Sequence, residues 1–563
     1  MGVRRAVDLV LDAANHAQPP IYTFGPLIHN TQVLQILTEK NITILDQIPE
    51  KGAGTVLIRA HGIPPEQKRQ LMDAGFYVID ATCPRVIKVH NIIKKYATDG
   101  YTTIIVGDSI HPEVKGLLGC AQGQGVTIHS IDGFHSLPAY QKAIVVAQTT
   151  QDVALFKQIS HQIANSYPNY KIFNTICDST SQRQSEIKQL ASIVDTVVVV
   201  GGYNSGNTQR LVQIVESQNR KAHHIETETD LNLDLLKDVK SIGITAGAST
   251  PNWIIRRVYH EIEMLSYQDQ GNSKRLLFKI IQVLLLTNIY IGLGAGCLAW
   301  ACMLLQEIQP SFNLVCMAFF YIVSMHTLNH LISRKSERYN YPNRAAFYQQ
   351  YKSLLTLLAF GSGLTGLAIT FSHGVVPFII LLIMSLLGLA YQVNIIPVRY
   401  DKMTYRSIQD IPGSKTVLIA IAWGIVTAIL PGISVDHTSD ITTLFVFLGA
   451  ASIAFVRTAF FDMLDIQGDR IIGRETLPIL IGELKTQRLL RSILICLFLC
   501  LIISSILKWT PLPGIWFSFI ILSLLILFTA YHKGYVVQGT RLEFFVETHF
   551  TATGLFSILF FIS

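Results

Sequence analysis

Long apolar stretches fill the second half of this 563-residue chain and are absent from its first half. An α-helix needs roughly 20 apolar residues to cross a bilayer. We therefore expect about nine transmembrane helices, near residues 276–303, 311–332, 353–372, 375–393, 415–431, 441–460, 489–508, 513–531 and 545–562. The sequence predicts three parts: a soluble domain at 1–265, a polar linker at 266–274 and an all-α polytopic membrane domain at 275–563.

Basic residues are unevenly distributed among the loops of the second half. Lys and Arg cluster around 333–352, 399–415 and 470–488, whereas the loops near 306–311 and 431–440 contain neither. Basic loops usually face the cytoplasm, so we expect a multi-pass protein of the cytoplasmic membrane with its N-terminal domain in the cytoplasm. The chain begins with the pattern of an amphipathic helix, not the apolar core of a signal peptide. The net charge of +7 is modest, and we expect the lipid bilayer as a partner but no nucleic acid.

The first half repeats a rhythm of strand, loop and helix. Short apolar runs precede segments with helical apolar spacing, and the runs lie at 21–23, 55–59, 77–80, 102–106, 143–147, 170–173, 196–200 and 241–245. Apolar strands that alternate with amphipathic helices are typical of βαβ units, so we predict an α/β fold with mostly parallel sheets.

The loops after these strands carry the candidate binding and metal-ligating residues. Helix N-termini bind anions through free N–H groups, and Ser205, Asn207 and Ser249 are well placed for a phosphate. The alternative is that such residues are ordinary helix caps. Cys83 and Cys177 each follow a strand and precede a helix, which suggests a shared metal centre. The alternative for them is a pair of buried apolar thiols. The other six cysteines are interpreted as structural.

Nine segments in order resemble the 4-hydroxy-3-methylbut-2-enyl diphosphate reductase family. They are Gly-Val-Arg-Arg-Ala at 2–6, Leu-Ile-His-Asn at 27–30, Arg-Ala-His-Gly at 59–62, Ala-Thr-Cys-Pro at 81–84, His-Pro-Glu-Val at 111–114, Gln-Thr-Thr at 148–150, Thr-Ile-Cys at 175–177, Asn-Ser-Gly-Asn at 204–207 and Thr-Ala-Gly-Ala-Ser at 245–249. The resemblance implies three α/β lobes around a central cavity. It also implies reduction of that substrate to isopentenyl and dimethylallyl diphosphate, the last step of the methylerythritol phosphate route to isoprenoids.

The resemblance also implies a cofactor and roles for particular residues. Three cysteines of the family hold a 4Fe–4S cluster with one open iron, which makes Cys83 and Cys177 cluster ligands here. Glu113 becomes the proton source, helped by His111 and Thr149. The implied substrate-binding residues are His29, His61, His111, Thr149, Ser205, Gly206, Asn207 and Ser249. Gly206 departs from the common serine of the family. The implied electron donor is a reduced ferredoxin or flavodoxin.

The third cysteine of the family would stand immediately before Met1, because the family pattern is Cys-x-Gly-Val-x-Arg-Ala and this chain begins Met-Gly-Val-Arg-Arg-Ala. Two explanations compete: the true start lies upstream, or the cluster has been lost. We expect the first, because every later motif survives. Two thiolates alone should hold a cluster poorly, so the alternative function is a membrane protein whose N-terminal domain is not catalytic.

The membrane half has one informative loop. Asp462, Asp465 and Asp469 follow one another at spacings of three and four, on one helix face. Mg²⁺ bridging a diphosphate would relieve their repulsion, although a solvated acidic helix end is the alternative. The run Gly-Asp-Arg at 468–470, Gly473 and Thr-Leu-Pro at 476–478 resembles the second motif of UbiA-type intramembrane prenyltransferases.

The first UbiA motif, Asn-Asp-x-x-Asp-x-x-x-Asp, is only partly present. Its counterpart at 329–337 keeps Asn329 and has Glu337 as its single carboxylate, which leaves half of the Mg²⁺ clamp in doubt. Arg334 and Arg338 either hold phosphate or are plain cytoplasmic-side charges. The leading hypothesis is an iron–sulfur reductase tethered to a prenyltransferase-like domain. The alternatives are a membrane half that is only an inactive scaffold, and a protein that is chiefly a prenyltransferase.

Overall fold

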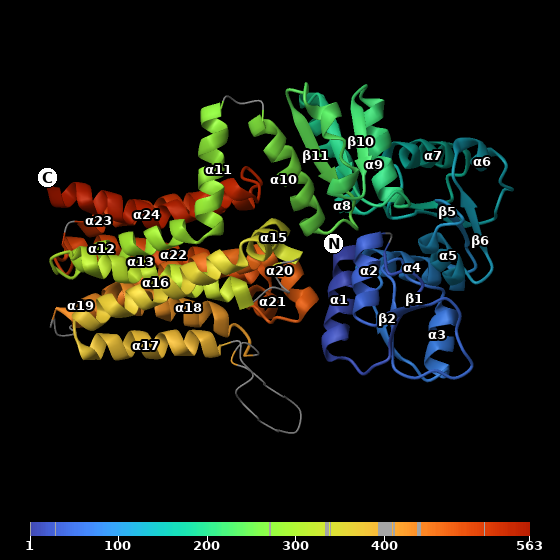
Figure 1. Ribbon diagram of the computed structural model, residues 1–563. Coiled ribbons are helices and arrows are strands. Elements are labelled where there is room, and N and C mark those ends of the chain that lie inside the picture. Colours follow the sequence, from blue (N-terminus) through green and yellow to red (C-terminus); the bar gives the residue numbers. More distant parts are fainter. Residues whose placement is uncertain are drawn as a thin grey trace. The chain divides into compact units, whose positions relative to one another are not determined.

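The computed structural model describes residues 2–28, 30–268, 272–332, 337, 339–391, 408, 411–435, 441–511 and 513–562. The chain divides into two compact units, Met1–Leu265 and Ser266–Ser563 (Figure 1). The first combines strands and helices, and the secondary structure elements described in the second are all helices.

Unit 1 contains three separate sheets, and every pairing in them is parallel. The first has the order β2-β1-β3-β4, from β1 (Ile21–Phe24), β2 (Ile42–Leu45), β3 (Thr55–Ile58) and β4 (Tyr77–Asp80). The second has the order β6-β5-β7-β8, from β5 (Thr102–Val106), β6 (Gly125–Ile128), β7 (Ala143–Ala147) and β8 (Lys171–Phe173). The third has the order β10-β9-β11, from β9 (Thr196–Val200), β10 (Lys221–Ile225) and β11 (Ile242–Ala246). The predicted parallel α/β fold is confirmed.

The sequence interpretation missed β2, β6 and β10, and each of them is an edge strand. The central strands β3, β7 and β9 are buried at every position, whereas β2, β6 and β10 are partly exposed along most of their length. A strand buried on both faces produces a continuous apolar run. An edge strand does not need one, so the pattern in the sequence was too weak to detect.

The helices of unit 1 connect these strands and begin at the carboxyl ends of several of them. They are α1 (Gly2–His16), α2 (Thr31–Glu39), α3 (Pro65–Asp73), α4 (Pro84–Thr98), α5 (Pro112–Cys120), α6 (Ile131–His135), α7 (Val153–Ser166), α8 (Asp178–Ile193), α9 (Gly206–Ser217) and α10 (Asn252–Gln268). Pro at the first helical position starts α4 and α5, where a missing N–H costs nothing. The residues that cap α4, α5, α8 and α9 are Cys83, His111, Cys177 and Ser205. The predicted site residues therefore sit at helix starts.

Unit 2 is a bundle of helices around one large apolar core. It consists of α11 (Asn272–Leu286), α12 (Ile289–Leu305), α13 (Phe312–Ile332), α15 (Pro342–Gln350), α16 (Lys352–Ser372), α17 (Val375–Ala390), α18 (Ser414–Gly424), the π-helix η4 (Ile425–Ile429), α19 (Leu430–Ser434), α20 (Ile441–Ile472), α21 (Leu477–Ile481), α22 (Glu483–Ile506), α23 (Pro513–His532) and α24 (Thr540–Ile562). Helices α18, η4 and α19 follow one another as one span, Ser414–Ser434.

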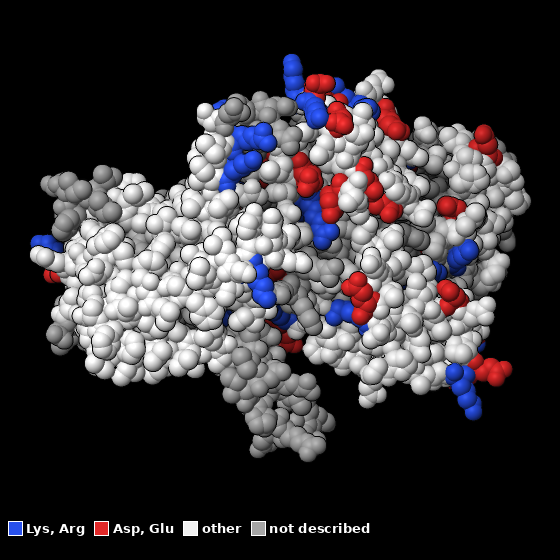
Figure 2. Space-filling model, in the orientation of Figure 1, with Lys and Arg blue, Asp and Glu red and all other residues white. Residues whose placement is uncertain are grey.

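All nine predicted apolar stretches fall on helices, but the number of complete membrane spans is smaller. Among the described residues, six helices are long and apolar enough to cross a bilayer, and seven if the bent pair α11 and α12 counts as one span. Helix α17 has 16 residues, and α24 carries Arg541, Glu543 and Glu547. The count of nine is therefore approximate. Figure 2 shows that the visible surface over α16 and α17 is nearly free of charged side chains, as a lipid-facing surface requires.

The predicted span at 276–303 is in fact two helices that meet at 73°. The break lies at Asn288, which adopts a left-handed conformation with φ of 60°. Its side-chain amide is buried and donates hydrogen bonds to Thr327 Oγ1 at 3.1 Å and Tyr348 Oη at 2.8 Å. These contacts stabilise a conformation that asparagine tolerates better than most residues. The segment 266–274, predicted as a linker, is helical up to Gln268 and again from Asn272.

Candidate functional sites

Cys83 and Cys177 occupy equivalent positions, each capping the helix that follows it. Arg85 lies two residues beyond Cys83 and Asp178 lies one residue beyond Cys177, and an ion pair between them joins the starts of α4 and α8. Both cysteines are partly exposed and neither forms a disulfide. A Cβ atom added to Gly2 would clash with Cys83 Sγ, because the backbone of Gly2, the first residue of α1, packs directly against this sulfur.

Glu113 is the most deeply buried acid of this region, with 1% of its surface exposed. Its carboxylate accepts the backbone N–H of Thr149 at 2.6 Å and the hydroxyl of Thr149 at 2.9 Å. Burial raises the pKa of Glu113 to about 7, and the two hydrogen bonds from Thr149 limit that rise. The carboxyl group is therefore about half protonated near neutral pH. The backbone N–H of Cys177 donates to the carbonyl of Thr149 at 2.9 Å, which connects the acid to the cysteine.

Histidines connect Glu113 to the other cysteine. His111 caps α5, and its Nδ1 accepts the backbone N–H of Glu113 at 3.2 Å. The ring of His111 meets the ring of His61 edge to face, with centroids 5.2 Å apart. Next to His61, the carbonyl of Ala60 accepts the N–H of Cys83 at 2.9 Å. The contacts thus form a continuous path from Cys83 to Cys177. His29, also predicted for the site, lies outside the described residues.

The start of α9 offers donors for an anion. Ser205 caps this helix and accepts the N–H of Thr208 at 3.4 Å. Asn207 Nδ2 and Ser249 Oγ are buried atoms with no hydrogen-bond partner in the described part of the chain, and such groups are uncommon unless a ligand or water completes them. No atom lies within 4 Å of a Cβ built on Gly206, so the backbone there is openly accessible.

An ion pair between Arg210 and Asp152 ties α9 to α7, which begins just beyond Thr149. The anion-binding donors and the acid are therefore held on neighbouring elements. In unit 1, hydrogen bonds and a ring contact connect part of the predicted site, from Cys83 and His61 to Glu113, Thr149 and Cys177.

In unit 2, a polar chamber of about 110 Å³ is lined by all four residues predicted there: Asn329, Asp462, Asp465 and Asp469. The three aspartates project from α20. Asp462 is 1% exposed and binds Lys415 Nζ at 2.8 Å and Thr416 Oγ1 at 2.7 Å.

Asp469 makes a weaker contact in the same chamber. Its Oδ1 accepts Asn340 Nδ2 at 3.5 Å. Its second oxygen is buried and has no hydrogen-bond partner among the described residues.

The sequence interpretation missed the cations of this chamber. Lys415, Arg344 and Arg457 line it. The sequence places Lys415 and Arg344 in basic loops that are predicted to face the cytoplasm. Arg344 pairs with Glu543, and Arg457 makes a bidentate pair with Glu547 inside the bundle. The available signal was the occurrence of charged residues within or beside apolar stretches, which is rare unless they are functional or paired.

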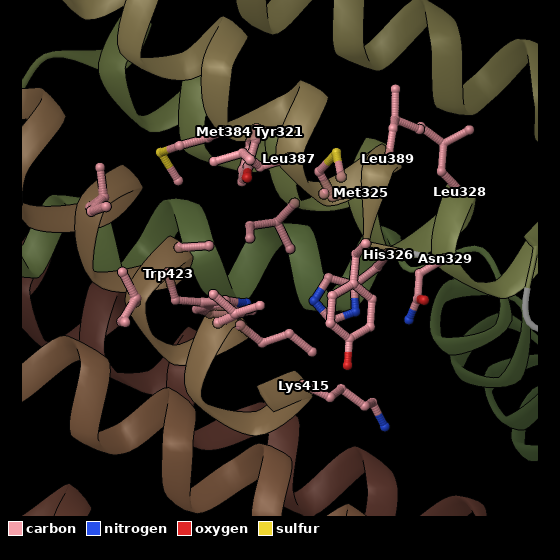
Figure 3. A pocket seen from close by; sticks show the side chains of 18 of the residues that line it. Tyr321, Met325, His326, Leu328, Asn329, Met384, Leu387, Leu389, Lys415 and Trp423 are labelled. Carbon is pink, nitrogen blue, oxygen red and sulfur yellow. The ribbon is translucent and has the colours of Figure 1, made fainter. Parts of the chain in front are cut away.

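An apolar cavity of about 310 Å³ adjoins the polar chamber, and Asn329, His326 and Lys415 line both. In Figure 3, Lys415 and Asn329 lie on one side of His326, whereas Met384 and Tyr321 lie on the other side. The arrangement places charge at one end of an elongated apolar space.

Comparison with known proteins agrees with the division of the chain into two units. Residues 1–263 match the profile of the LytB protein family. The 4-hydroxy-3-methylbut-2-enyl diphosphate reductase of Aquifex aeolicus is 41% identical over 267 residues, which are 46% of this chain and 92% of that protein. The chain belongs to the LytB family. A solved structure of such a reductase, 40% identical, aligns with 47% of this chain and 95% of its own, with a TM-score of 0.39.

The second half of this LytB-family protein matches another family. Residues 294–547 match the profile of the UbiA prenyltransferase family. A solved UbiA homologue from Archaeoglobus fulgidus, bound to GPP and Mg²⁺, is 13% identical and covers 48% of this chain and 96% of its own, with a TM-score of 0.37. By the two profile matches, residues 1–263 form a LytB-type domain and residues 294–547 a UbiA-type domain. Both predicted resemblances are confirmed.

The residues present fit the cofactors of these families in part. In the described part of the protein, no three His, Cys, Asp or Glu side chains are grouped to hold a metal ion by themselves. Cys83 and Cys177 provide two sulfur donors, each at a helix N-terminus, and cysteine sulfurs are the usual ligands of iron–sulfur clusters. In the UbiA-type domain, Asp465 and Asp469 line the chamber, and the buried second oxygen of Asp469 suits one Mg²⁺ that shares its coordination with a phosphate.

Proposed function

We propose that the N-terminal domain reduces 4-hydroxy-3-methylbut-2-enyl diphosphate to isopentenyl and dimethylallyl diphosphate. The observation that carries this proposal is the buried Glu113, whose pKa lies near 7 and which is connected through Thr149 to Cys177. The reaction consumes two electrons and two protons and releases the hydroxyl group of the substrate as water. A carboxyl group that is half protonated at neutral pH suits the role of proton donor.

The other side chains of the site would bind the cluster, bind the diphosphate and orient Glu113. Cys83 and Cys177 would hold the 4Fe–4S cluster together with a third ligand that is not among the candidate residues named above. Such a cluster, when bound, supplies the electrons and an open iron for the substrate hydroxyl. The N-terminus of α9, with Ser205 and Asn207, would bind the diphosphate together with Ser249. His61 and His111 would orient Glu113 and shield it from bulk water. The electron donor we propose is a reduced ferredoxin or flavodoxin.

Anaerobic purification of the full protein, carrying an added cysteine directly before Met1 as the third family ligand, tests this proposal. We expect a brown protein with iron and sulfide bound, and a turnover of the substrate with a chemical reductant. Cys83→Ser and Cys177→Ser should lose both colour and turnover. Cys120→Ser is the matched control, because Cys120 is buried in a structural core away from the site. Glu113→Gln should keep the colour and lose roughly 10²–10⁴-fold of the turnover, the usual contribution of a general acid. A colourless protein, or a fully active Glu113→Gln variant, contradicts the assignment.

We also propose that the UbiA-type domain binds a prenyl diphosphate and transfers the prenyl group to an acceptor in the membrane. The diphosphate would lie in the polar chamber, against Lys415 and a Mg²⁺ ion held by Asp465 and Asp469. Transfer of a labelled prenyl group should require Mg²⁺ and be abolished by Asp465→Asn. Glu307→Gln is the control, since Glu307 lies in an exposed loop at the end of α12. If Asp465→Asn leaves prenyl transfer unchanged, the assignment of Mg²⁺ binding to these aspartates is wrong.

One observation favours a second candidate for this domain, a binding scaffold without transfer. Both oxygens of Asp462 are already engaged, and Glu337, the single carboxylate at 329–337, pairs with His330. A scaffold would bind prenyl diphosphate without releasing diphosphate.

We further propose that the N-terminal domain lies in the cytoplasm, because Lys and Arg gather in alternate loops of the membrane half. Protease treatment of sealed inside-out vesicles should digest the N-terminal domain, and the same treatment of right-side-out vesicles should leave it intact.

A further inference from the structure

We propose that helix α11 lies in the membrane interface and binds the headgroups of anionic phospholipids. This helix, Asn272–Leu286, falls between the two family matches, which end at residue 263 and begin at residue 294. Neither match includes it. Three observations support the proposal: the direction of α11, the apolar surface that it leaves uncovered, and the charges at the edge of that surface.

The direction of α11 differs from that of the helices that cross the membrane. It meets α12 at 73°, and Figure 1 shows it running across the direction of α12 and α13. A helix at this angle to a spanning helix lies closer to the membrane plane than to the membrane normal. Helix α12 does not need α11 to complete a span, because its 17 residues reach the lower limit of about 17 for crossing the hydrocarbon core.

One side of α11 packs on the helical bundle. Phe278 and Leu285 are buried, and they lie seven residues apart, which is about two helical turns. Both side chains therefore occupy the same face of the helix. Helix α11 contacts α12 and α24. This packing determines which side of α11 is left without a protein partner in unit 2.

The uncovered side of α11 is apolar. Leu276, Leu277, Ile280 and Val283 are 46–60% exposed. Their spacings of three and four residues place them on one continuous surface, which we call the apolar stripe. A contiguous exposed apolar surface marks a contact with a membrane or with another protein. In a domain whose helices are long and apolar enough to cross a bilayer, lipid is the apolar phase available to this stripe.

Basic side chains border the apolar stripe. Lys274, Arg275 and Lys279 are exposed, and α11 contains no Asp or Glu. None of the ion pairs among the described residues involves these three cations. Arg275, Lys279 and Val283 follow one another at intervals of four, so the two cations lie along the edge of the stripe. A basic edge beside a leucine-rich face is typical of helices that lie in the membrane interface.

Charge complementarity selects anionic phospholipid as the occupant of this surface. Its acyl chains would cover the apolar stripe, and its headgroup would supply the negative charge that the three cations lack within the described part of the chain. A zwitterionic phospholipid would cover the stripe but bring no net charge. Helix α11 begins shortly after α10 ends at Gln268, so the bound lipids would belong to the leaflet on the side of the N-terminal domain.

Photocross-linking of the full protein in nanodiscs tests the proposal. The nanodiscs contain phosphatidylcholine with a minor fraction of phosphatidylglycerol, and p-benzoylphenylalanine replaces Ile280 in the middle of the stripe. Each basic residue near an anionic membrane surface favours it by roughly fivefold. Mass spectrometry of the adducts should show phosphatidylglycerol enriched at least about fivefold over its share of the nanodisc lipid. The same label at Leu386 is the matched control, because Leu386 is 57% exposed on α17, which contains no charged residue; adducts there should match the bulk lipid.

Charge variants separate recognition of the headgroup from apolar contact alone. The triple change Lys274→Gln, Arg275→Gln and Lys279→Gln should reduce the enrichment at position 280 to below about twofold. The triple change Lys274→Arg, Arg275→Lys and Lys279→Arg keeps the charge and should keep the enrichment. All three side chains are exposed, so both variants should unfold at the wild-type temperature. High salt should act on the wild type as the glutamine changes do.

Two results would overturn the proposal. Adducts between position 280 and protein, whether the N-terminal domain or a second copy of the chain, would show that the apolar stripe is a protein interface. Equal shares of phosphatidylglycerol at positions 280 and 386, or an enrichment that survives the glutamine changes, would show that charge does not select the lipid. The reductase and prenyl-transfer proposals are independent of either result.

Discussion

Replacing Thr149 by valine should move the pH dependence of the reductase, because the hydroxyl of Thr149 stabilises the charged form of Glu113. In the wild type this hydroxyl donates to the carboxylate at 2.9 Å, and burial keeps the pKa of Glu113 at about 7. Glu113 acts as a donor only when it is protonated. Activity should therefore be full below pH 7 and decline as the pH rises through the pKa.

The size of the shift follows from the lost hydrogen bond. A hydrogen bond to a charged group contributes about 1.5–3 kcal/mol, and one pKa unit corresponds to about 1.4 kcal/mol. Removing the Thr149 hydroxyl should raise the pKa of Glu113 by about one to two units, since the backbone N–H of residue 149 still donates at 2.6 Å. The decline of activity should then begin near pH 8 or above.

The measurement is kcat/KM as a function of pH under anaerobic conditions, which reports the pKa values of the free enzyme. Thr149→Ser is the matched control, because it keeps the hydroxyl and should keep the wild-type profile even if the maximal rate falls. Glu113→Gln should show no decline of this kind. A Thr149→Val profile that is unchanged, or shifted to lower pH, would refute the reasoning and assign the titration to another group.

Three further predictions concern packing and binding. Arg457→Leu should destabilise the protein by about 3–5 kcal/mol in a heat-unfolding assay, because it leaves Glu547 charged and unpaired inside the bundle. The double variant with Glu547→Leu should recover much of this loss of stability. Gly468→Ala should cost about 1–3 kcal/mol in the same assay, since the new methyl group would lie 1.8 Å from Asn340 Oδ1. Gly206→Ser should fold normally, because a Cβ atom added at Gly206 meets no other described residue within 4 Å beyond its chain neighbours. It should lower the KM for the diphosphate substrate; an unchanged KM would place the diphosphate elsewhere.

The sequence was sufficient to predict the centres of the sheets and the loops that carry the candidate residues of the reductase domain. Strands such as β3 and β7 are buried on both faces and so must be continuously apolar, which makes them visible in a single sequence. The site residues follow these strands at helix starts. Cys83 and Cys177 could therefore be singled out from their position alone, and the family resemblance added Glu113 and the histidines.

Contacts between distant segments explain what the sequence could not predict. Lys415 and Arg344 look like ordinary basic residues at the ends of apolar stretches. Their burial depends on partners far away in the chain, Asp462 for one and Glu543 for the other. The break in the helix before α12 depends in the same way on acceptors that belong to α13 and α15. Periodicity reports the local environment of a residue, and these pairings are not local.

The two domains differ in how they would hold the same kind of anion, and the difference follows from what each site must do. The membrane chamber contains Lys415 and Arg344, whereas the pKa of Glu113 is raised by burial and held back by hydrogen bonds from Thr149. A lysine or arginine beside Glu113 would favour its carboxylate form and lower its pKa, which would remove the proton that reduction requires. Neutral donors at the start of α9 can bind a diphosphate without this penalty, and the charge of the bound substrate should raise the pKa of Glu113 further. The proposed prenyl transfer in the chamber would need no such proton, so cations there would neutralise the leaving diphosphate directly.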